Sequence, residues 1–594
     1  MAVSPVRAVA ARRPFASSLF ASSLVERLLV SAWVDVVLIS MVVGLAGTVR
    51  WPHLLLSPQF PSVGDTILMA LDVAEGRAFY LADSAPYLGA PFIWLLALVY
   101  RVFGASLEVT QKLVWALGAL TIIPTYLLGR EVGGRGAGVV AALFLATSGA
   151  HTVITSHVAL SHSLTPLVAT TALWLVARAT NRAASPTGED AASSSVSARG
   201  WLGSGRLAQG GRLLALAGLV SGLALQTHPT AAPMLVGAAL GALLMRRGWL
   251  RTRWPVVAVA LVVVGYSSLL VYHVTSRFEI IGDVESKQAR YLDADVDAGE
   301  TSDRGVYVNN LEQLGLSTVR MVGGALTDRE GPADYLRDPW VLAPLALASA
   351  GLALGVWRRQ WWLVGGVLLA VALPPAFSGK YHPILDGRYL MPLLPVLFVA
   401  MGLAIATAAR LLATLPIGEG RPGVVALLGR SAAVVVLALG TAVLAAHPLS
   451  LLDSYYKESQ EDGFSNVQYL RTVSQLEAAR RGDEAVLLDP LLTTVKSTGG
   501  GKASTSFLFL LALSDIPNAP LPMAKPNETP GVTAHTDLVG RLAVLHRSTA
   551  DNLDDTLGLE PLDGKRANGK DSPSYRAYRI GVFEAGAPPS RPRR

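Results

Sequence analysis

Several long runs of apolar residues constrain this chain more than any other feature of its sequence. Residues 28–48, 254–272 and 389–409 each approach or reach the ~20 residues needed to cross the hydrocarbon core of a bilayer. The chain is 51% hydrophobic and 16% charged, with a mean hydropathy of +0.43. A soluble protein of 594 residues does not normally carry this much apolar surface. We therefore predict an α-helical polytopic membrane protein.

The apolar runs divide the predicted membrane region, residues 28–450, into individual helices. The first run is predicted to be a retained helix after a cytoplasmic segment, residues 1–27, because no convincing small-residue cleavage site follows it. Further helices are expected at 112–129, 136–150, 164–177, 213–226, 231–245, 254–272, 340–356, 361–377, 389–409 and 431–446. The short helices near residues 151–165 would open a water-filled cavity at the outer surface, where non-helical backbone is tolerated.

Arginine residues gather at the ends of these runs, and their distribution predicts the topology. Basic clusters remain on the cytoplasmic side of a membrane, and here they alternate if about eleven helices cross. The predicted cytoplasmic clusters lie at residues 7–27, 130–135, 178–212, 246–253, 358–359 and 410–430. This topology requires residues 89–103 to lie along the interface, which their short length and Trp94, Tyr100 and Arg101 allow.

The connecting segments differ in composition. A first outer loop is predicted at 49–111 and a large polar outer loop at 273–339, whereas the Ser-, Ala- and Gly-rich segment 179–212 is expected to be a flexible cytoplasmic loop. Residues 451–594 change in composition again. Two segments there, AVLLDP (485–490) and RLAVLHR (541–547), are typical of buried strands. They predict a small extracytoplasmic α/β domain.

Several classes of function are disfavoured. The absence of cysteine excludes disulfides and thiolate metal sites. The net charge of +7 does not indicate a nucleic-acid partner, because most arginines lie at the ends of apolar runs and form no single patch. STGGGKAST (497–505) is not a phosphate-binding loop, because Lys496 and Ala503 stand where that motif needs Gly and Ser or Thr.

Acidic residues concentrate in the first outer loop, at Asp65, Asp72, Glu75 and Asp83. Uncompensated charge beside a membrane is costly, so these carboxylates indicate function before stability. For Asp65 the alternative is an N-cap of a helix over residues 66–75, which Gly76 would end. Asp72 lies seven residues later, on the same helical face, and is either a helper of Asp65 or a solvated charge.

A series of motifs then follows in a characteristic order. Gly64-Asp65-Thr66 opens the first outer loop, and an FG turn, GREVGGRG (129–136), GLALQTHPT (222–230) and GRYLMPLLPVL (387–397) come after it. This order resembles the polyprenyl-phosphate-dependent membrane glycosyltransferases of the GT-C class, which include protein O-mannosyltransferases and lipid A aminoarabinose transferases. The resemblance covers most of the membrane region.

The resemblance implies a GT-C-like fold and a specific chemistry. A sugar would pass from a polyprenyl phosphate donor to a lipid, glycan or protein acceptor on the outer face of the plasma membrane. Asp65 would be the general base, with a pKa raised by partial burial. Members of the class commonly have Glu after this Asp, where this chain has Thr66. Either Asp65 acts alone, or Asp72 or Asp83 substitutes for the Glu.

The phosphate leaving group needs cationic neutralisation, best by arginine or lysine. The outer-face candidates are Arg388, Lys380 and His382, which lie just before a predicted helix. The alternative is that these residues are interfacial anchors.

Histidines cluster at His151, His157 and His162. The five-residue separation of His157 and His162 gives no shared helix face, so neither a metal site nor any other cofactor is indicated. These two residues are candidates for hydrogen bonds to the substrate, or else ordinary interfacial histidines. His228, before Pro229, is predicted to be a polar group at a helix end.

Two rival interpretations remain open. A transporter or flippase of a lipid-linked substrate would share the helices, but it should carry ionisable residues at mid-membrane on several spans. Here Asp35 is the only evident acidic residue deep in a predicted span. The third possibility is a non-catalytic member of the class whose tail binds an outer partner.

Overall fold

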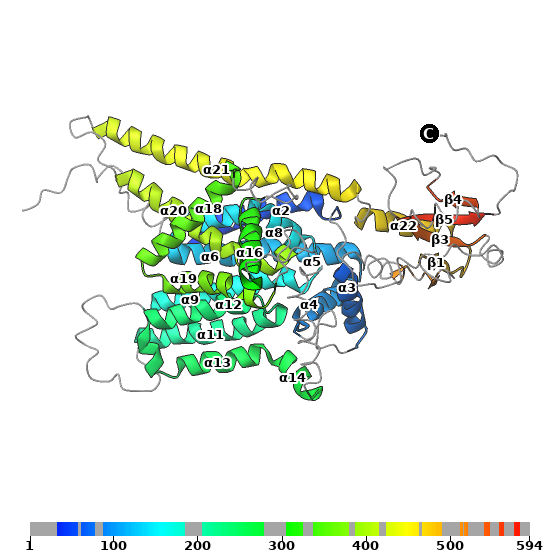
Figure 1. Cartoon of the computed structure of the whole chain (residues 1–594), viewed down its shortest axis with the longest axis horizontal. Coiled ribbons are helices and arrows are strands. Elements are labelled where there is room, and N and C mark those ends of the chain that lie inside the picture. The colour runs from blue at the N-terminus through cyan, green and yellow to red at the C-terminus, as the bar shows by residue number, and fades with distance from the viewer. Residues whose placement is uncertain are drawn as a thin grey trace, which may run out of the picture.

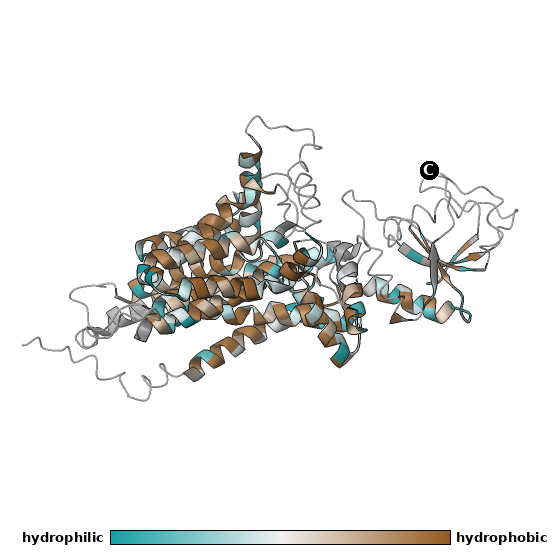
Figure 2. Ribbon diagram, turned by 90° about the horizontal axis from the view of Figure 1, so that it is seen from below, coloured by the Kyte–Doolittle hydropathy of each residue, from teal (hydrophilic) through white to brown (hydrophobic). Residues whose placement is uncertain are grey.

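The computed structural model describes residues 32–56, 61–77, 87–183, 205–277, 305–324, 337–378, 386–414, 423–461, 466–489, 511, 513–514, 516–520, 540–546, 550, 558–563 and 575–581. Most of these residues form helices that lie side by side in one bundle, and the strands lie beyond one end of it (Figure 1). Hydrophobic residues dominate the bundle helices (Figure 2). The predicted α-helical membrane fold with a small C-terminal strand region is confirmed.

The helices follow the predicted apolar runs closely. The first half of the bundle contains α2 (Ala32–Arg50), η2 (Trp51–His53), α3 (Pro61–Ala74), α4 (Pro91–Phe103), α5 (Leu107–Leu120), α6 (Ile122–Gly133), α7 (Arg135–Thr147), α8 (Gly149–Ser156) and α9 (Ser161–Arg182). The second half contains α11 (Gly205–Thr227), α12 (Ala231–Met245), η3 (Arg247–Arg251), α13 (Trp254–Gly265), α14 (Ser267–Thr275), α16 (Val306–Val322), α18 (Pro339–Trp357), α19 (Trp361–Ala372), η5 (Pro374–Ala376), η6 (Asp386–Leu390), α20 (Leu394–Thr414) and α21 (Gly423–Glu461).

Within the described part of the chain, six helices are long and apolar enough to cross a membrane, or up to eight if each of two bent pairs is one span. Helices α13 and α14 meet at 62° and interrupt the run 254–272, which was predicted as continuous. Helices α7 and α8 meet at 66°, and α8 occupies part of the segment after residue 150 where a turn was expected. The number of about eleven crossings stays a prediction. Helix α4 has 13 residues, or ~20 Å, which is shorter than the ~30 Å hydrocarbon core.

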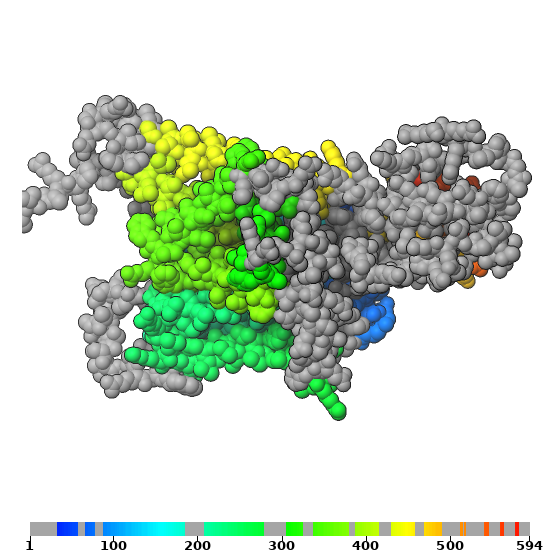
Figure 3. Space-filling model, in the orientation of Figure 1, coloured from blue at the N-terminus to red at the C-terminus, as the bar shows by residue number. Residues whose placement is uncertain are grey.

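Glycines let the helices of the bundle approach one another closely. A Cβ atom at Gly241 of α12 would lie 2.1 Å from the carbonyl oxygen of Trp361 in α19. A Cβ atom at Gly222 of α11 would lie 2.2 Å from the carbonyl oxygen of Val262 in α13. Close backbone packing on small residues is the usual means of joining helices within lipid. In Figure 3 the helices coloured green and yellow lie directly against one another.

The arginine-rich helix ends meet at one end of the bundle, as the predicted topology requires. Arg178 at the end of α9 pairs with Glu131 of α6 (3.3 Å), and Arg246 donates to the carbonyl oxygen of Thr180 (2.9 Å). Arg410 of α20 donates to the carbonyl oxygen of Gly133 at the end of α6. These contacts join the ends of helices that were expected to face the same side.

Asp35 belongs to the same end of the bundle, where two arginines and a tyrosine engage its carboxylate. Its carboxylate accepts hydrogen bonds from Arg135 Nε (2.8 Å) and Tyr126 Oη (2.7 Å), and it lies 2.9 Å from Arg130 Nη1. Both arginines belong to the predicted cytoplasmic cluster. The carboxylate therefore joins the starts of α2 and α7 to the end of α6.

Helix α16 is an addition that the sequence did not predict, because the large outer loop was expected to be a polar stretch without a helix. Tyr307 Oη donates to the carbonyl oxygen of Ala372 (2.8 Å), and Asn310 Nδ2 donates to that of Pro375 (3.0 Å). The helix runs across the direction of the bundle helices in Figure 1. The predicted flexible loop 179–212 is also shorter, since α9 continues to Arg182 and α11 begins at Gly205.

The described part of the tail contains the end of α21, helix α22 (Asn466–Ala479) and a sheet. The strands are β1 (Val486–Leu488), β2 (Asn518–Pro520), β3 (Leu542–His546), β4 (Gly558–Pro561) and β5 (Tyr575–Gly581), in the order β2-β1-β3-β5-β4. Strand β1 pairs in parallel with β2 and β3, whereas β5 is antiparallel to β3 and β4. The two segments predicted as strands from AVLLDP and RLAVLHR are confirmed as β1 and β3.

Candidate functional site

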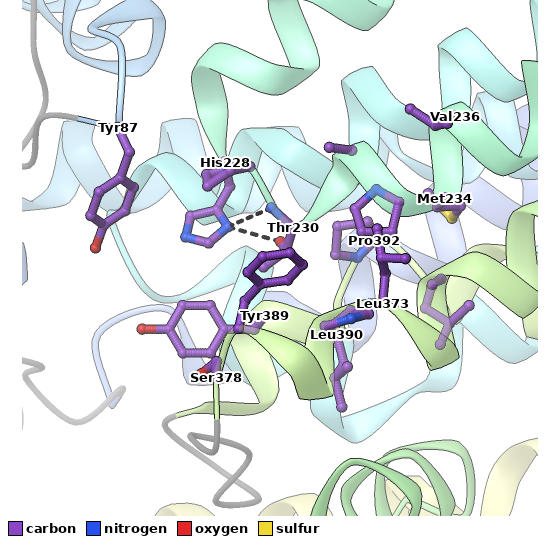
Figure 4. Close-up of a pocket in the computed structure, with 17 residues that line it drawn as sticks. Tyr87, His228, Thr230, Met234, Val236, Leu373, Ser378, Tyr389, Leu390 and Pro392 are labelled. Atoms are coloured by element: carbon purple, nitrogen blue, oxygen red, sulfur yellow. Dashed lines mark hydrogen bonds between the residues drawn. The ribbon is translucent and has the colours of Figure 1, made fainter. Parts of the chain in front are cut away.

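A cavity of about 490 Å³ opens between α12, the end of α19 and the segment that leads into α20 (Figure 4). This volume lies within the ~300–1,000 Å³ of typical ligand pockets. Its wall is mostly apolar, and its lining residues are Tyr87, His228, Pro229, Thr230, Ala232, Pro233, Met234, Val236, Ala370, Leu373, Pro374, Phe377, Ser378, Tyr389, Leu390, Pro392 and Leu393.

Part of the apolar wall is also exposed on the outside of the bundle. Val236 of α12 is 52% exposed, and Leu373 and Phe377 beyond α19 are 42% and 55% exposed. The cavity therefore opens onto an apolar part of the bundle surface. Such an opening suits an amphipathic ligand with a long hydrocarbon tail.

One end of the cavity is polar and aromatic. The ring of His228 lies 5.2 Å from that of Tyr389 and 6.3 Å from that of Tyr87, measured between centroids. The guanidinium of Arg388 lies 4.8 Å from the centre of the Tyr389 ring, and its Nη2 donates to the Tyr389 hydroxyl (2.9 Å). The structure thus brings the predicted phosphate ligand Arg388 next to the cavity, within reach of a charged headgroup.

His228 occupies the turn between α11 and α12, and the sequence predicted only a polar helix end there. Its Nδ1 accepts a hydrogen bond from the backbone N–H of Thr230 (3.2 Å) and lies 2.8 Å from the Thr230 hydroxyl. Because Nδ1 is an acceptor, the proton of the neutral ring is on Nε2. Burial, and second the positive charge of Arg388, lower the pKa of His228 to about 3. The ring is therefore a neutral hydrogen-bond donor at physiological pH.

His162 lies behind this ring, in the first turn of α9. Its imidazole is 4.1 Å from that of His228 and 5.6 Å from the Tyr389 ring, between centroids. It is only 8% exposed, and among the described residues neither of its ring nitrogens has a hydrogen-bond partner. His162, a predicted substrate contact, is thus next to the polar end of the cavity.

His157 is placed differently from His162. Its Nε2 lies 2.9 Å from the carbonyl oxygen of Arg50, and its Nδ1 contacts the hydroxyl of Tyr456 from α21. His151 Nδ1 accepts from Arg50 Nη2 (3.0 Å) in the same buried cluster. His157 is fully buried with both nitrogens engaged inside the protein, so the structure gives it a packing role and no route to the cavity.

The predicted base lies on α3, whose start differs from the prediction. Helix α3 begins at Pro61, so Asp65 lies within its second turn and is not its N-cap. The side chain of Asp65, together with Lys380, His382 and Asp83, lies outside the described residues. The predicted stop is confirmed, since α3 ends at Ala74 and Gly76 has a φ of +106°. Asp72 pairs with Arg77 (2.7 Å) on the surface.

Helix α3 is tied to the cavity through α4. Arg101 of α4 donates from Nε and Nη2 to the carbonyl oxygens of Ala74 and Val73, each at 3.0 Å. At the other end of α4, the backbone N–H of Gly89 donates to the carbonyl oxygen of Gln226 (2.8 Å), two residues before His228. The helix of the predicted base and the polar end of the cavity therefore belong to one packed unit.

No three His, Asp or Glu side chains of the described residues come together as metal ligands do. The site in this part of the chain consists of a guanidinium, two imidazoles and two phenols. These groups donate hydrogen bonds and favour an anion.

Comparison with known proteins places the fold in a defined class. No protein-family model matches the sequence, and no curated protein does. Two crystal structures of ArnT from Cupriavidus metallidurans are similar along nearly their whole length. The structure bound to undecaprenyl phosphate has a TM-score of 0.54 at 16% identity, over 94% of this chain and 100% of that one. The apo structure has a TM-score of 0.52 at 15% identity, over 92% and 98%.

A more distant match is the archaeal oligosaccharyltransferase AglB from Archaeoglobus fulgidus, in complex with an inhibitory peptide and a dolichol-phosphate. It covers 77% of this chain and 63% of that one, at 15% identity and a TM-score of 0.39. The predicted GT-C-like fold is confirmed by the likeness to ArnT.

Proposed function

We propose that this chain is a membrane glycosyltransferase that moves a sugar from a polyprenyl phosphate donor to an acceptor on the outer face of the plasma membrane. The observation that carries the proposal is the apolar cavity, open to an apolar part of the bundle surface, that ends against Arg388, His228 and Tyr389. A polyprenyl phosphate has the same division into a long hydrocarbon and a compact anion. The undecaprenyl phosphate bound to the ArnT of similar fold supports this donor class.

In this mechanism the hydrocarbon lies against α12 and α19, and the phosphate lies beside Arg388. Asp65 accepts the proton of the acceptor hydroxyl while the acceptor oxygen forms its bond to the anomeric carbon. The bond between that carbon and the phosphate oxygen breaks, and polyprenyl phosphate leaves with both electrons. Arg388 neutralises the charge that develops on this leaving group. Direct attack inverts the anomeric centre.

Asp65 is preferred over Asp72 as the base for a geometric reason. The Asp72 carboxylate lies 2.7 Å from Arg77 Nη2 in an ion pair whose partners are 28% and 65% exposed. The ion pair engages the Asp72 carboxylate at the surface, which leaves Asp65, the residue that the resemblance assigns, as the candidate base on α3. Thr66, which stands in place of the common Glu, is 1% exposed and presents no carboxylate.

The test compares Asp65→Asn with Asp72→Asn in proteoliposomes. The probes are radiolabelled polyprenyl phosphate pentoses and hexoses, with a membrane extract as the source of acceptor. We expect Asp65→Asn to lower the rate of transfer by about 10²–10⁴-fold, the usual contribution of a general base. Asp72→Asn, the matched control from the same helix, should stay close to the wild type.

Full activity of Asp65→Asn would remove the base assignment. If no donor in the panel supports transfer, but labelled lipid crosses the bilayer, the rival interpretation as a flippase replaces the proposal.

A further inference from the structure

The two imidazoles beside the cavity are unusual because one of them lacks any partner among the described residues. His162 is 92% buried, and neither of its nitrogens makes a hydrogen bond there. Buried polar groups are almost always hydrogen-bonded, since an unsatisfied one costs free energy. A ligand that enters from outside the chain would supply the missing partner.

His228 is prepared for such a ligand by its neighbour. The N–H of Thr230 holds Nδ1 as an acceptor, so Nε2–H is the free donor of the ring. In Figure 4 this second nitrogen points away from Thr230, toward the side of the cavity that carries Tyr87. His228 can therefore donate to a ligand without rotating its ring.

One helix N-terminus faces the same place. Helix α9, with 22 residues, begins at Ser161 next to His162, and the positive end of its dipole favours an anion there. The start of α12 adds no donors, because the N–H groups of Ala231 and Ala232 donate to the carbonyl oxygens of His228 (3.3 Å) and Pro229 (2.8 Å) and residue 233 is proline. Together with the guanidinium of Arg388 and the ring of His162, which has no partner among the described residues, the α9 dipole indicates that the ligand at this end of the cavity is negatively charged.

We propose that His228 and His162 form a neutral, hydrogen-bond-donating subsite for the phosphate of a polyprenyl phosphate, beside Arg388. This inference rests on the proposed function for the nature of the lipid. Arg388 provides the positive charge that attracts the phosphate. The imidazoles orient the phosphate, because the Nε2–H of His228, with its tautomer fixed by Thr230, can donate to a phosphate oxygen from one side only. The subsite thus positions the leaving group for in-line displacement.

The experiment measures equilibrium binding to the full chain in detergent, without any transfer reaction. The probes are a short-chain polyprenyl phosphate, the corresponding polyprenol and inorganic phosphate as a competitor. We expect His228→Leu to weaken binding of the polyprenyl phosphate by about 10- to 100-fold while binding of the polyprenol is almost unchanged. Weak competition by inorganic phosphate would identify the lipid phosphate, and strong competition a free phosphate, as the preferred ligand.

Conservative variants separate donation from packing. His228→Gln carries an amide N–H at the reach of Nε2 and should restore affinity to within about 5-fold of the wild type, whereas the shorter His228→Asn should not. His447→Gln is the matched control, since His447 stacks on Trp340 and does not line the cavity. If His228→Leu also loses affinity for the polyprenol, that variant has disturbed the packing of the cavity. The affinities of His228→Gln and His228→Asn for polyprenyl phosphate then show whether hydrogen-bond donation at the Nε2 position matters.

The pH dependence distinguishes a neutral donor from a cation. The ratio of wild-type affinity to His228→Gln affinity cancels the ionisation of the ligand, and we expect it to stay constant from about pH 8 to about pH 6. A ratio that rises as the pH falls would mean that His228 binds as an imidazolium, which would overturn the neutral subsite.

Equal phosphate affinity in the wild type, His228→Leu and His228→Asn would overturn the inference altogether. That result would leave the proposed function untouched. Conversely, a chain that binds polyprenyl phosphate through His228 but transfers no sugar would overturn only the proposed function.

Discussion

Replacement of Arg50 is the strongest test of how the bundle is held together. The side chain is 0% exposed at the end of α2, and it reaches the bend between α7 and α8. Its Nη1 donates to the carbonyl oxygens of Ala46 (2.9 Å) and Ala146 (2.8 Å), and its Nη2 donates to that of Leu145 (3.2 Å). Its Nε donates to Ser156 Oγ (2.9 Å). Arg50 therefore satisfies the C-terminal carbonyls of α7 from a neighbouring helix.

The magnitude follows from the groups that Arg50→Met would leave without their donor. The Ala46 carbonyl retains its own helical bond and costs little. Ala146 and His151 Nδ1 lose their donor, and Leu145 keeps only a long backbone contact from Ser148 (3.4 Å). At ~1–3 kcal/mol for each buried acceptor, and with the Ser156 contact also lost, the variant should lose about 3–5 kcal/mol of stability. Arg50→Met also removes a buried positive charge, which is favourable and offsets part of this loss. The offset is included in the estimate of about 3–5 kcal/mol.

Thermal unfolding in detergent, followed by the fraction of monodisperse protein after heating, measures the effect. A loss of this size should lower the melting temperature by about 5–10 °C for a cooperative unit of a few hundred residues. Arg358→Met is the control, because the Arg358 guanidinium makes one hydrogen bond, to Thr407 Oγ1 (3.0 Å), at a less buried site. A melting temperature for Arg50→Met equal to that of Arg358→Met would refute the reasoning.

Two further predictions concern packing and donor binding. Gly241→Ala should lower the yield of folded protein, because the new Cβ would lie 2.1 Å from the Trp361 carbonyl oxygen. Gly44→Ala is the control, since its new Cβ meets nothing within 4 Å and the variant should fold normally. Equal yields of the two variants would contradict the close packing of α12 on α19. Arg388→Ala should raise the KM for the polyprenyl phosphate sugar by about 10- to 100-fold and leave the KM for the acceptor unchanged. An unchanged donor KM would make Arg388 an interfacial anchor.

Much of the bundle could be predicted because membrane helices are encoded locally. Apolar length defined the helices, and arginine at their ends defined which ends share a side. The bend after Gly265 could not be predicted, because residues 254–272 form one apolar run. A break near residue 150 was predicted from the polar residues there, but not the short helix α8 that follows it. Helix α16 escaped prediction for the opposite reason: it lies in a polar region, and its contacts with Ala372 and Pro375 are distant in sequence.

The candidate site was only partly predictable for a related reason. Arg388 was identifiable as a basic residue before an outer helix end. The importance of His228 depends on Tyr389 and His162, which lie far from it in the sequence, and on a local bond with Thr230. The motif THPT did place a polar group between two apolar helices. Only the fold reveals that this turn closes one end of a cavity.

The two ends of the bundle use charge in different ways, and this bears on the choice between enzyme and transporter. At the arginine-rich end, Asp35 and Glu131 are engaged by Arg130, Arg135 and Arg178 in contacts between helices. These pairs lock helix ends together. Asp35, the acidic residue that was expected deep in a span, is thus held by fixed ion pairs. A transporter that carries an anion between the two sides needs polar groups along the path that can exchange partners. Among the residues that the structure describes, the imidazole without a hydrogen-bond partner lies instead at the other end, beside the cavity, where the proposed transfer would take place at a single membrane face.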